Sequence, residues 1–297
     1  MTAPLRVLEL FSGLGGWRYA LGGRGTVVAA YDIHPGANAT YALNHKQRPL
    51  DRNLATLPLA ALAGHGADTW MMSPPCQPFC RMGNQSDVQD PRAAPYLRLM
   101  EVLDAAPPDH LVLENVVGFL DTRAHAVLLA RLDRHGFHRL AFSVCASRFG
   151  MPNLRPRTYV VASRQPLRRP ALPELQAPAL AGFLDAEEDE RLYLGPEHLR
   201  HTPGLDLVRP EDARSSCFIG GYGQRFTGSG SFLVTPRGIR RFSPGEVARL
   251  LGYPGSFRFP EGLSLLQRYK LLGNGLSLPV ARWVVGHLDG DPGWPGA

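Results

Sequence analysis

The amino-acid sequence predicts an α/β fold, with a doubly wound, mostly parallel sheet, helices on both faces and a smaller insertion. Strand-like apolar runs alternate with helical segments from residue 5 to about residue 163, as they do in a parallel sheet. A glycine turn and single polar residues follow the strands directly, and the alternation stops from about Arg164 to Gly238. Such sheets bind ligands beyond the carboxyl ends of their strands, so that edge is the predicted site.

The predicted elements follow one another in chain order. "LRVLEL" is a buried-strand run, and "FSGLGG" is a glycine turn that leads into a helix. Later apolar runs bounded by turn residues predict further strands. The expected strands cover residues 5–10, 26–32, 67–73, 109–116 and 157–163, and the expected helices cover residues 17–23, 36–46, 96–106 and 124–136.

The composition is that of a folded globular protein. Of the 297 residues, 44% are hydrophobic and 20% are charged, which argues against a disordered or fibrous chain. No stretch approaches the roughly 20 apolar residues of a membrane helix, and the N-terminus enters a strand without a signal-like segment. We therefore expect a cytoplasmic protein with no membrane partner.

Charge and cysteine content narrow the classes of partner. Lys plus Arg number 32 against 26 Asp plus Glu, a net charge of +6, and most basic residues are Arg. Arg suits phosphates and bases, so this balance permits a nucleic-acid partner without proving one. Cys76, Cys80, Cys145 and Cys217 are too few and scattered for a disulfide framework. Cys76 and Cys80 lack a second Cys or His pair at zinc-ligand spacing, so we expect no metal.

The glycine turn is the first candidate binding element. Gly13, Gly15 and Gly16 allow a tight turn and a close backbone approach to a ligand, and the next helix offers free N–H groups. Asp32 ends the second strand, where a carboxylate can accept hydrogen bonds from ribose hydroxyls. The spacing is G-x-G-G and not G-x-G-x-x-G, which fits a nucleoside with a carboxylate better than a pyrophosphate. Taken alone, the glycines are equally well explained by the turn itself.

Cys76 and Glu114 are the candidate catalytic residues. Cys76 follows Pro74 and Pro75 at a strand end, before a polar loop that carries Arg81, so a rigid turn would present its thiol for covalent catalysis. The alternative is a small buried cysteine. Glu114 ends the apolar run "LVLENV", where desolvation would raise its proton affinity. Its alternative is a surface acid that caps the next helix.

Five motifs resemble, in order, those of the cytosine C5-methyltransferases: "LELFSGLGG", "SPPCQPF", "LENV", "RPRTYVVA" and "LLGNGLSLPVA". The resemblance reaches both ends of the chain and implies a Rossmann-like fold that uses S-adenosylmethionine. It implies that Cys76 is the nucleophile, that Glu114 binds and protonates the cytosine ring, and that Arg155 and Arg157 help to hold the base and to order the catalytic loop. The residues it places around the cofactor are Phe11, Ser12, Gly13, Leu14, Gly15, Gly16, Asp32, Ile33, Asn53, Leu54, Ser73, Asn274 and Gly275.

The same resemblance divides the chain. Residues 1–163 and 239–297 would form the catalytic domain, and residues 164–238 a target-recognition region. In that region "RSSCFIGGYGQRFTGSGS" resembles the tRNA cytosine-38 C5-methyltransferases, a branch first classed as a second DNA methyltransferase family. Ile219 departs from the Thr of the branch, whereas Asn153 stands where many DNA enzymes have Gln. The residues expected to contact nucleic acid are Arg81, Arg92, Cys217, Tyr222 and Arg225.

Three functions follow from these observations. The favoured one is a tRNA cytosine C5-methyltransferase that acts on an anticodon-loop cytosine, most simply position 38 of aspartate tRNA. The second is a DNA cytosine C5-methyltransferase, and the third is a nucleic-acid-binding protein without catalytic activity. Cys76, Glu114 and Arg157 argue against the third, and the short recognition segment argues for RNA over a long DNA site. We expect a monomer.

Overall fold

A computed structural model describes residues 3–75, 89–187, 189–199 and 202–289. The chain divides into two compact units. Unit 1 comprises Met1–Val144, Pro156–Ala171 and Ala281–Ala297, and unit 2 comprises Cys145–Arg155 and Leu172–Val280. These boundaries differ from the predicted division at residues 164 and 239. The functional division into catalytic and target-recognition parts remains a prediction.

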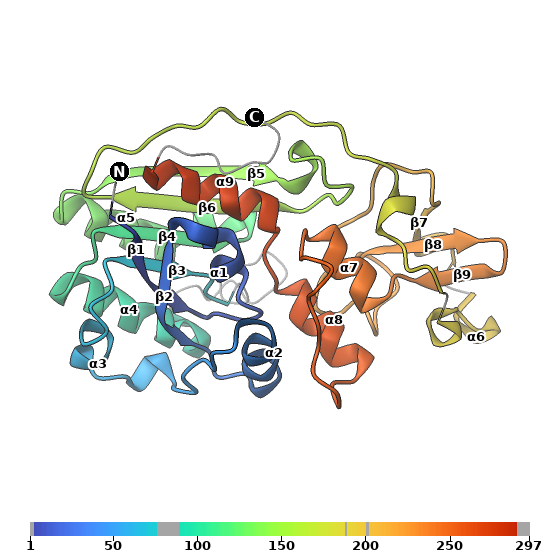
Figure 1. Cartoon of the computed structure of the whole chain (residues 1–297), viewed down its shortest axis with the longest axis horizontal. Helices are drawn as coiled ribbons and strands as arrows, with labels where there is room; N and C mark the ends of the chain where they lie inside the picture. Colours follow the sequence, from blue (N-terminus) through green and yellow to red (C-terminus); the bar gives the residue numbers. More distant parts are fainter. Residues whose placement is uncertain (1–2, 76–88, 188, 200–201, 290–297) are drawn as a thin grey trace. The chain divides into compact units, whose positions relative to one another are not determined.

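Unit 1 is built on a six-stranded sheet in the order β2-β1-β3-β4-β6-β5 (Figure 1). β1 pairs in parallel with β2 and β3, β3 pairs in parallel with β4, and β6 runs antiparallel to β4. The sheet is therefore mostly parallel, as predicted. Its strands are β1 (Leu5–Leu10), β2 (Gly25–Tyr31), β3 (Thr69–Met72), β4 (His110–Asn115), β5 (His138–Cys145) and β6 (Pro156–Ser163).

Helices cover both faces of this sheet (Figure 1). Leu8 and Leu10 point from β1 into a core shared with the helices after β2 and β3, because alternate residues of a strand face opposite sides. On the other face Tyr159 of β6 meets Trp17, with ring centroids 6.4 Å apart, and Phe142 of β5 meets Trp283 at 5.4 Å. The helices are α1 (Gly16–Leu21), α2 (Pro35–His45), α3 (Leu59–Ala63), α4 (Ala94–Ala105), α5 (Arg123–Arg134) and α9 (Leu278–Asp289).

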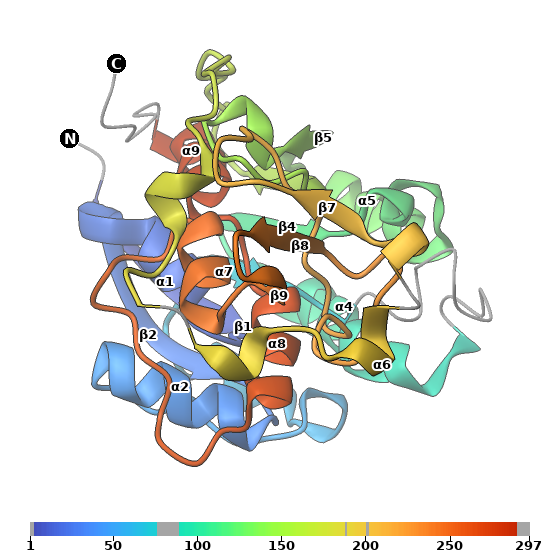
Figure 2. The same cartoon turned by 90° about the vertical axis from the view of Figure 1, so that its right-hand side faces the viewer.

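Unit 2 contains a three-stranded sheet in the order β7-β8-β9, with α7 and α8 nearby (Figure 2). Both helices begin with a capping box, Ser243 with Glu246 in α7 and Ser264 with Gln267 in α8. Glu246 is also fully buried and forms an ion pair with Arg240 at 2.8 Å. The elements are β7 (Asp206–Val208), β8 (Ser231–Thr235), β9 (Gly238–Arg241), α6 (Pro196–Leu199), α7 (Pro244–Leu250) and α8 (Leu265–Gly273).

Short 3-10 helices connect the main elements. Each spans only three to five residues, as expected for this strained geometry. They are η1 (Gly22–Arg24), η2 (Leu54–Thr56), η4 (Pro91–Ala93), η5 (Val117–Asp121), η6 (Ala146–Arg148), η7 (Leu180–Phe183), η8 (Glu190–Leu192) and η9 (Thr202–Gly204). Across the described ranges, no helix has both the length and the hydropathy needed to cross a membrane.

The predicted strands and helices of unit 1 are all present, with ends shifted by at most two residues. β5 and α3 were not predicted. In β5 most side chains are exposed or half-buried, and among the described strands it pairs only with β6, at the end of the sheet order. It therefore lacks the buried apolar run that marks the central strands.

Candidate active site

The glycine turn lies at the carboxyl end of β1. Phe11 and Gly13 have φ angles of 54° and 52°, so the chain reverses through backbone conformations that side chains other than glycine rarely adopt. The Ser12 N–H donates to the Tyr31 carbonyl at 2.9 Å, which ties the turn to the end of β2. A Cβ on Gly15 would lie 2.3 Å from the His45 ring, so the close approach of α2 requires glycine there.

Asp32 holds this turn in place from the end of β2. One carboxylate oxygen accepts the Gly13 N–H and the other accepts the His34 N–H, both at 2.8 Å. Burial raises the pKa of Asp32 above its usual value, while these N–H donors oppose the shift. Each oxygen retains a further lone pair, so the carboxylate can also accept a ligand hydroxyl. The adjacent Ile33 is 61% exposed and offers an apolar surface beside it.

The turn has the features that a small polar cofactor needs. The Ser12 hydroxyl is buried and has no hydrogen-bond partner among the described residues. A Cβ built on Gly13 would meet nothing closer than 4.0 Å, so the backbone there faces open space. Ser73, at the end of β3, accepts a hydrogen bond from the Trp17 indole at 3.0 Å. An unsatisfied hydroxyl, open backbone and the Asp32 carboxylate fit the polar groups of S-adenosylmethionine.

The other predicted cofactor residues are placed as follows. Leu14 and Gly16 are buried within the turn. Asn53 is exposed and caps η2 by accepting the Ala55 N–H at 2.9 Å, whereas the Leu54 side chain is buried in the core of unit 1. Leu54 can therefore reach a ligand only through its backbone. Asn274 and Gly275 belong to unit 2, where Asn274 is an exposed residue at the end of α8 and Gly275 is buried.

Glu9 is a residue of this region that the sequence analysis did not select. It is fully buried beneath the turn, where it accepts the Tyr41 hydroxyl at 2.8 Å and the Arg18 N–H at 3.4 Å. Burial raises the pKa of Glu9 to about 7, although both hydrogen bonds act to lower it. It thus links β1, α1 and α2 behind the cofactor residues. The sequence signal that could have indicated Glu9 is the presence of an acidic residue inside the apolar run "VLEL".

Glu114 and Arg157 meet at the carboxyl end of β4. The Arg157 Nε lies 3.2 Å from a Glu114 carboxylate oxygen, and the two side chains are only 14% and 10% exposed. The structure therefore brings together two of the predicted catalytic residues. Asn115, the next residue of β4, donates from its side chain to the Pro74 carbonyl at 3.1 Å, which anchors the segment that leads to the predicted nucleophile. Cys76 itself lies outside the described residues.

Burial bears on two of the predicted roles. Arg155 is 2% exposed, and its guanidinium donates to the carbonyls of Phe218, Gly273 and Gly275. These bonds give it a structural role within unit 2, and its contact with the base stays a prediction. Tyr222 has no exposed surface; its hydroxyl donates to the Ser231 carbonyl and accepts the Phe242 N–H. It is a core residue and cannot present its ring to nucleic acid.

The remaining predicted nucleic-acid contacts differ in accessibility. Arg225 is exposed at the surface of unit 2. Arg92 is 51% exposed but forms an ion pair with Asp90 at 2.5 Å, so a phosphate would have to compete with this carboxylate. Cys217 is half-buried, and its sulfur lies 3.4 Å from an Arg155 nitrogen. Arg81 lies outside the described residues.

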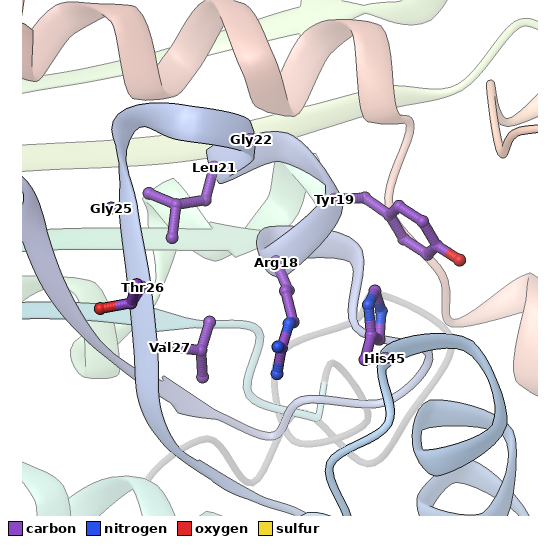
Figure 3. A pocket seen from close by; sticks show the side chains of 8 residues that line it. All are labelled: Arg18, Tyr19, Leu21, Gly22, Gly25, Thr26, Val27 and His45. Carbon is purple, nitrogen blue, oxygen red and sulfur yellow. The ribbon is translucent and has the colours of Figure 1, made fainter.

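A groove of about 500 Å³ runs beside α1 and the first residues of β2 (Figure 3). The Arg18 guanidinium in this groove hydrogen bonds to Gln47, and burial lowers the pKa of His45 to about 4, so the ring is neutral at pH 7. None of the predicted catalytic or cofactor residues is among the eight that line it. We therefore do not place the chemistry there. Within the described ranges, no three His, Cys, Asp or Glu side chains are grouped to hold a metal ion.

Comparisons with known proteins identify the family. The model of the C-5 cytosine-specific DNA methylases matches residues 5–192 and 207–289. A tRNA (cytosine(38)-C(5))-methyltransferase of Schizosaccharomyces pombe is 30% identical over an alignment of 321 positions, which covers 97% of this chain and 97% of that protein. A DNA (cytosine-5)-methyltransferase of Dictyostelium discoideum is 28% identical and covers 93% of this chain and 92% of that protein.

A solved structure agrees with the sequence comparisons. The structure of the Entamoeba histolytica methyltransferase EhMeth superposes with a TM-score of 0.92 at 26% identity, and the match covers 98% of this chain and 99% of that one. The mostly parallel sheet, the glycine turn at β1 and the Glu114–Arg157 pair at β4 are thus found in a chain that matches the family model over most of its length. The chain belongs to the C-5 cytosine-specific DNA methylase family and is a cytosine C5-methyltransferase with the S-adenosylmethionine-dependent chemistry of that family.

Proposed function

We propose that this protein methylates C5 of an anticodon-loop cytosine in tRNA, at position 38 and most simply in aspartate tRNA. The observation that carries the proposal is its likeness, over 97% of both chains, to a tRNA (cytosine(38)-C(5))-methyltransferase. The segment "CFIGGYG", which resembles the tRNA branch, points the same way. We further propose that the protein acts as a cytoplasmic monomer.

S-adenosylmethionine, when bound, would supply the methyl group as an electrophile. The chain's own residues would hold it at the β1 turn. The Ser12 hydroxyl and the open backbone at Gly13 would receive its polar groups, Asp32 would accept its ribose hydroxyls, and Ile33 would pack against its base. Asp32 and Gly13 are already joined at 2.8 Å, so this part of the site is preorganised.

The proposed chemistry assigns the nucleophile to Cys76 and the acid to Glu114. Cytosine C5 is a poor nucleophile, so the Cys76 thiolate first adds to C6 and the displaced electron pair moves toward N3. Glu114 donates a proton or hydrogen bond at N3, which offsets the developing charge and makes C5 nucleophilic. After C5 has been methylated, a water molecule accepts the C5 proton, the C5–C6 double bond re-forms, the Cys76 thiolate leaves and the N3 proton returns to Glu114.

Arg157 would position Glu114 during these steps. Its Nε lies 3.2 Å from the carboxylate, and both side chains are largely shielded from water. A charged partner at this distance fixes the carboxylate orientation. The bound base would compete with Arg157 for the carboxylate, which would leave Arg157 free to contact the base itself.

An anticodon loop suits this site better than a duplex. A base stacked in a helix is out of reach of the catalytic groups and must be extruded, at a cost of a few kcal/mol. Cytosines of an anticodon loop are already unpaired, so less unstacking is needed. DNA is the alternative substrate that the experiment should include, because the chain is also 28% identical to a protein named as a DNA (cytosine-5)-methyltransferase.

Bisulfite sequencing of small RNA and genomic DNA from cells with and without the protein tests the substrate. Protein-dependent 5-methylcytosine should appear at tRNA position 38. Cells that carry the Cys76→Ala variant should resemble cells without the protein, whereas Cys80→Ala serves as the matched control and should retain methylation. Protein-dependent 5-methylcytosine in DNA alone would overturn the tRNA proposal. An active Cys76→Ala variant would overturn the assignment of the nucleophile.

A further inference from the structure

Arg155 joins three segments of unit 2 that are distant in the sequence. One terminal nitrogen lies 3.1 Å from the Phe218 carbonyl and 3.4 Å from the Cys217 sulfur. The other lies 3.0 Å from the Gly273 carbonyl and 2.6 Å from the Gly275 carbonyl. The first pair belongs to the predicted recognition segment and the second to the predicted cofactor turn. A single buried side chain therefore bonds to both.

These acceptors require the guanidinium group. The planar fork of Arg donates in several fixed directions, whereas the ammonium of Lys is a compact point charge. Gly273 is the last residue of α8, so its carbonyl is at the negative end of the helix and has no partner within the helix. A cation there stabilises the helix end and the turn after it. A lysine side chain in place of Arg155 would reach only part of this set.

Backbone contacts at glycine make the same junction rigid. A Cβ on Gly273 would lie 2.1 Å from the Gly220 nitrogen and 2.3 Å from the Ile219 carbonyl carbon. The end of α8 and the recognition segment are thus packed main chain against main chain. Neither segment can shift without moving the other or breaking the bonds to Arg155.

Asn153 extends the junction to the start of the recognition segment. Its side-chain amide donates to the Ser215 hydroxyl at 3.1 Å and the Ser216 carbonyl at 2.9 Å. The Leu154 N–H donates to the Ser215 carbonyl at 2.8 Å. Residues 153–155 therefore hold the segment on both sides of Cys217, with Arg155 at the centre.

We propose that Arg155 is a positioning residue that couples the recognition segment at Cys217–Phe218 to the cofactor turn at Asn274–Gly275. This inference rests on the proposed function and on the predicted role of the turn in cofactor binding. Loss of the fork should weaken both the binding of cofactor and the binding of tRNA, because each depends on a segment that Arg155 holds. A residue that contacted the base directly would instead affect methyl transfer and leave cofactor binding unchanged.

Arg155→Lys tests the coupling, with Arg240→Lys as the matched control. Arg240 is also buried in unit 2, where it bonds to Glu246 and to the Arg241 carbonyl. The measurements are the Kd of S-adenosylhomocysteine by calorimetry, and KM and kcat with tRNA at saturating S-adenosylmethionine. Thermal unfolding of each variant measures how much each substitution lowers the stability of the protein.

Arg155→Lys should raise both the Kd of S-adenosylhomocysteine and the KM for tRNA by about tenfold, with a smaller change in kcat. Arg240→Lys should lower the unfolding temperature and keep both constants within about twofold of the natural protein. A fall in kcat with an unchanged Kd would overturn the proposal, and so would equal effects of the two variants. If Arg155→Lys fails to fold, Gly273→Ala takes its place, since the added Cβ separates the same two segments and should weaken cofactor binding.

The calorimetric measurement keeps this test independent of the substrate. If tRNA proves not to be the substrate, the natural protein will fail to methylate it, while the Kd of S-adenosylhomocysteine still reports on Arg155. An unchanged Kd in both Arg155→Lys and Gly273→Ala would refute the coupling whatever the substrate. Failure of the proposed function and failure of this inference therefore give different results.

Discussion

Replacing Glu9 with Gln should change how the stability of the protein depends on pH. Glu9 is fully buried, and burial raises its pKa from 4.5 to about 7 in the folded protein. Below pH 4.5 the carboxyl is protonated in both the folded and the unfolded chain. Between 4.5 and about 7 the unfolded chain loses this proton while the folded protein retains it, so stability falls as pH rises. Above 7 both states are ionised and the dependence ends.

The size of this effect follows from the shift. A difference of about 2.5 pKa units corresponds to roughly 3 kcal/mol, so the natural protein should lose about that much unfolding free energy between pH 4.5 and 8 through Glu9 alone. Gln has the same shape and does not titrate. Its oxygen can accept the Tyr41 hydroxyl, while its amide meets the Arg18 N–H at a cost that is independent of pH. Between pH 5 and pH 8 the Gln variant should therefore lose less unfolding free energy than the natural protein does.

Urea unfolding followed by circular dichroism at pH 5, 6, 7 and 8 measures this difference. His45, whose ring centroid is 4.7 Å from Tyr41, has its pKa lowered to about 4 and also contributes to the pH dependence. That contribution is present in both proteins and largely cancels when their free energies are subtracted. The subtracted curve should fall by roughly 2.5 kcal/mol across the range. A flat curve would show that Glu9 is ionised normally in the folded protein and would refute the reasoning.

Other consequences of the structure can be measured in the same way. Asp32→Ala should weaken S-adenosylhomocysteine binding by roughly 1.5 to 3 kcal/mol in calorimetry, and unchanged affinity in a folded variant would remove Asp32 from the cofactor site. Tyr222→Phe should cost about 1 to 3 kcal/mol of unfolding free energy because the Phe242 N–H loses its buried acceptor; a neutral substitution would contradict the assigned core role. Glu114→Gln should reduce kcat by about 100-fold or more while cofactor affinity is retained, and full activity would exclude it as the acid.

Local sequence signals were sufficient to predict the central strands and their order along the chain. β1, β3 and β4 are short apolar runs bounded by turn residues, and the residues at or just after their carboxyl ends were selected as site residues for that reason. The antiparallel direction of β6 was not predicted, because the direction of a strand depends on its connection and not on its own residues. The strand β5 was not predicted because it lacks the buried apolar run that marks the central strands.

The interactions of individual side chains were less predictable, since their partners are distant in the sequence. Glu9 receives hydrogen bonds from Arg18 and Tyr41, 9 and 32 residues away. Arg155 bonds to carbonyls 63, 118 and 120 residues away, so its motif indicated importance but not its structural role. Tyr222 sits in a segment that resembles a recognition motif, yet its ring is buried. A motif specifies residue identities, whereas burial depends on the packing of the whole unit.

Methyl transfer by the purified protein to defined substrates tests the central claim most directly. Labelled S-adenosylmethionine would be incubated with an aspartate tRNA transcript, with the same transcript carrying uracil at position 38, and with a duplex DNA of matched cytosine content. The account predicts label in the first substrate, little in the second and third, and none in any substrate with Cys76→Ala. Label in the duplex DNA with none in the tRNA would contradict it.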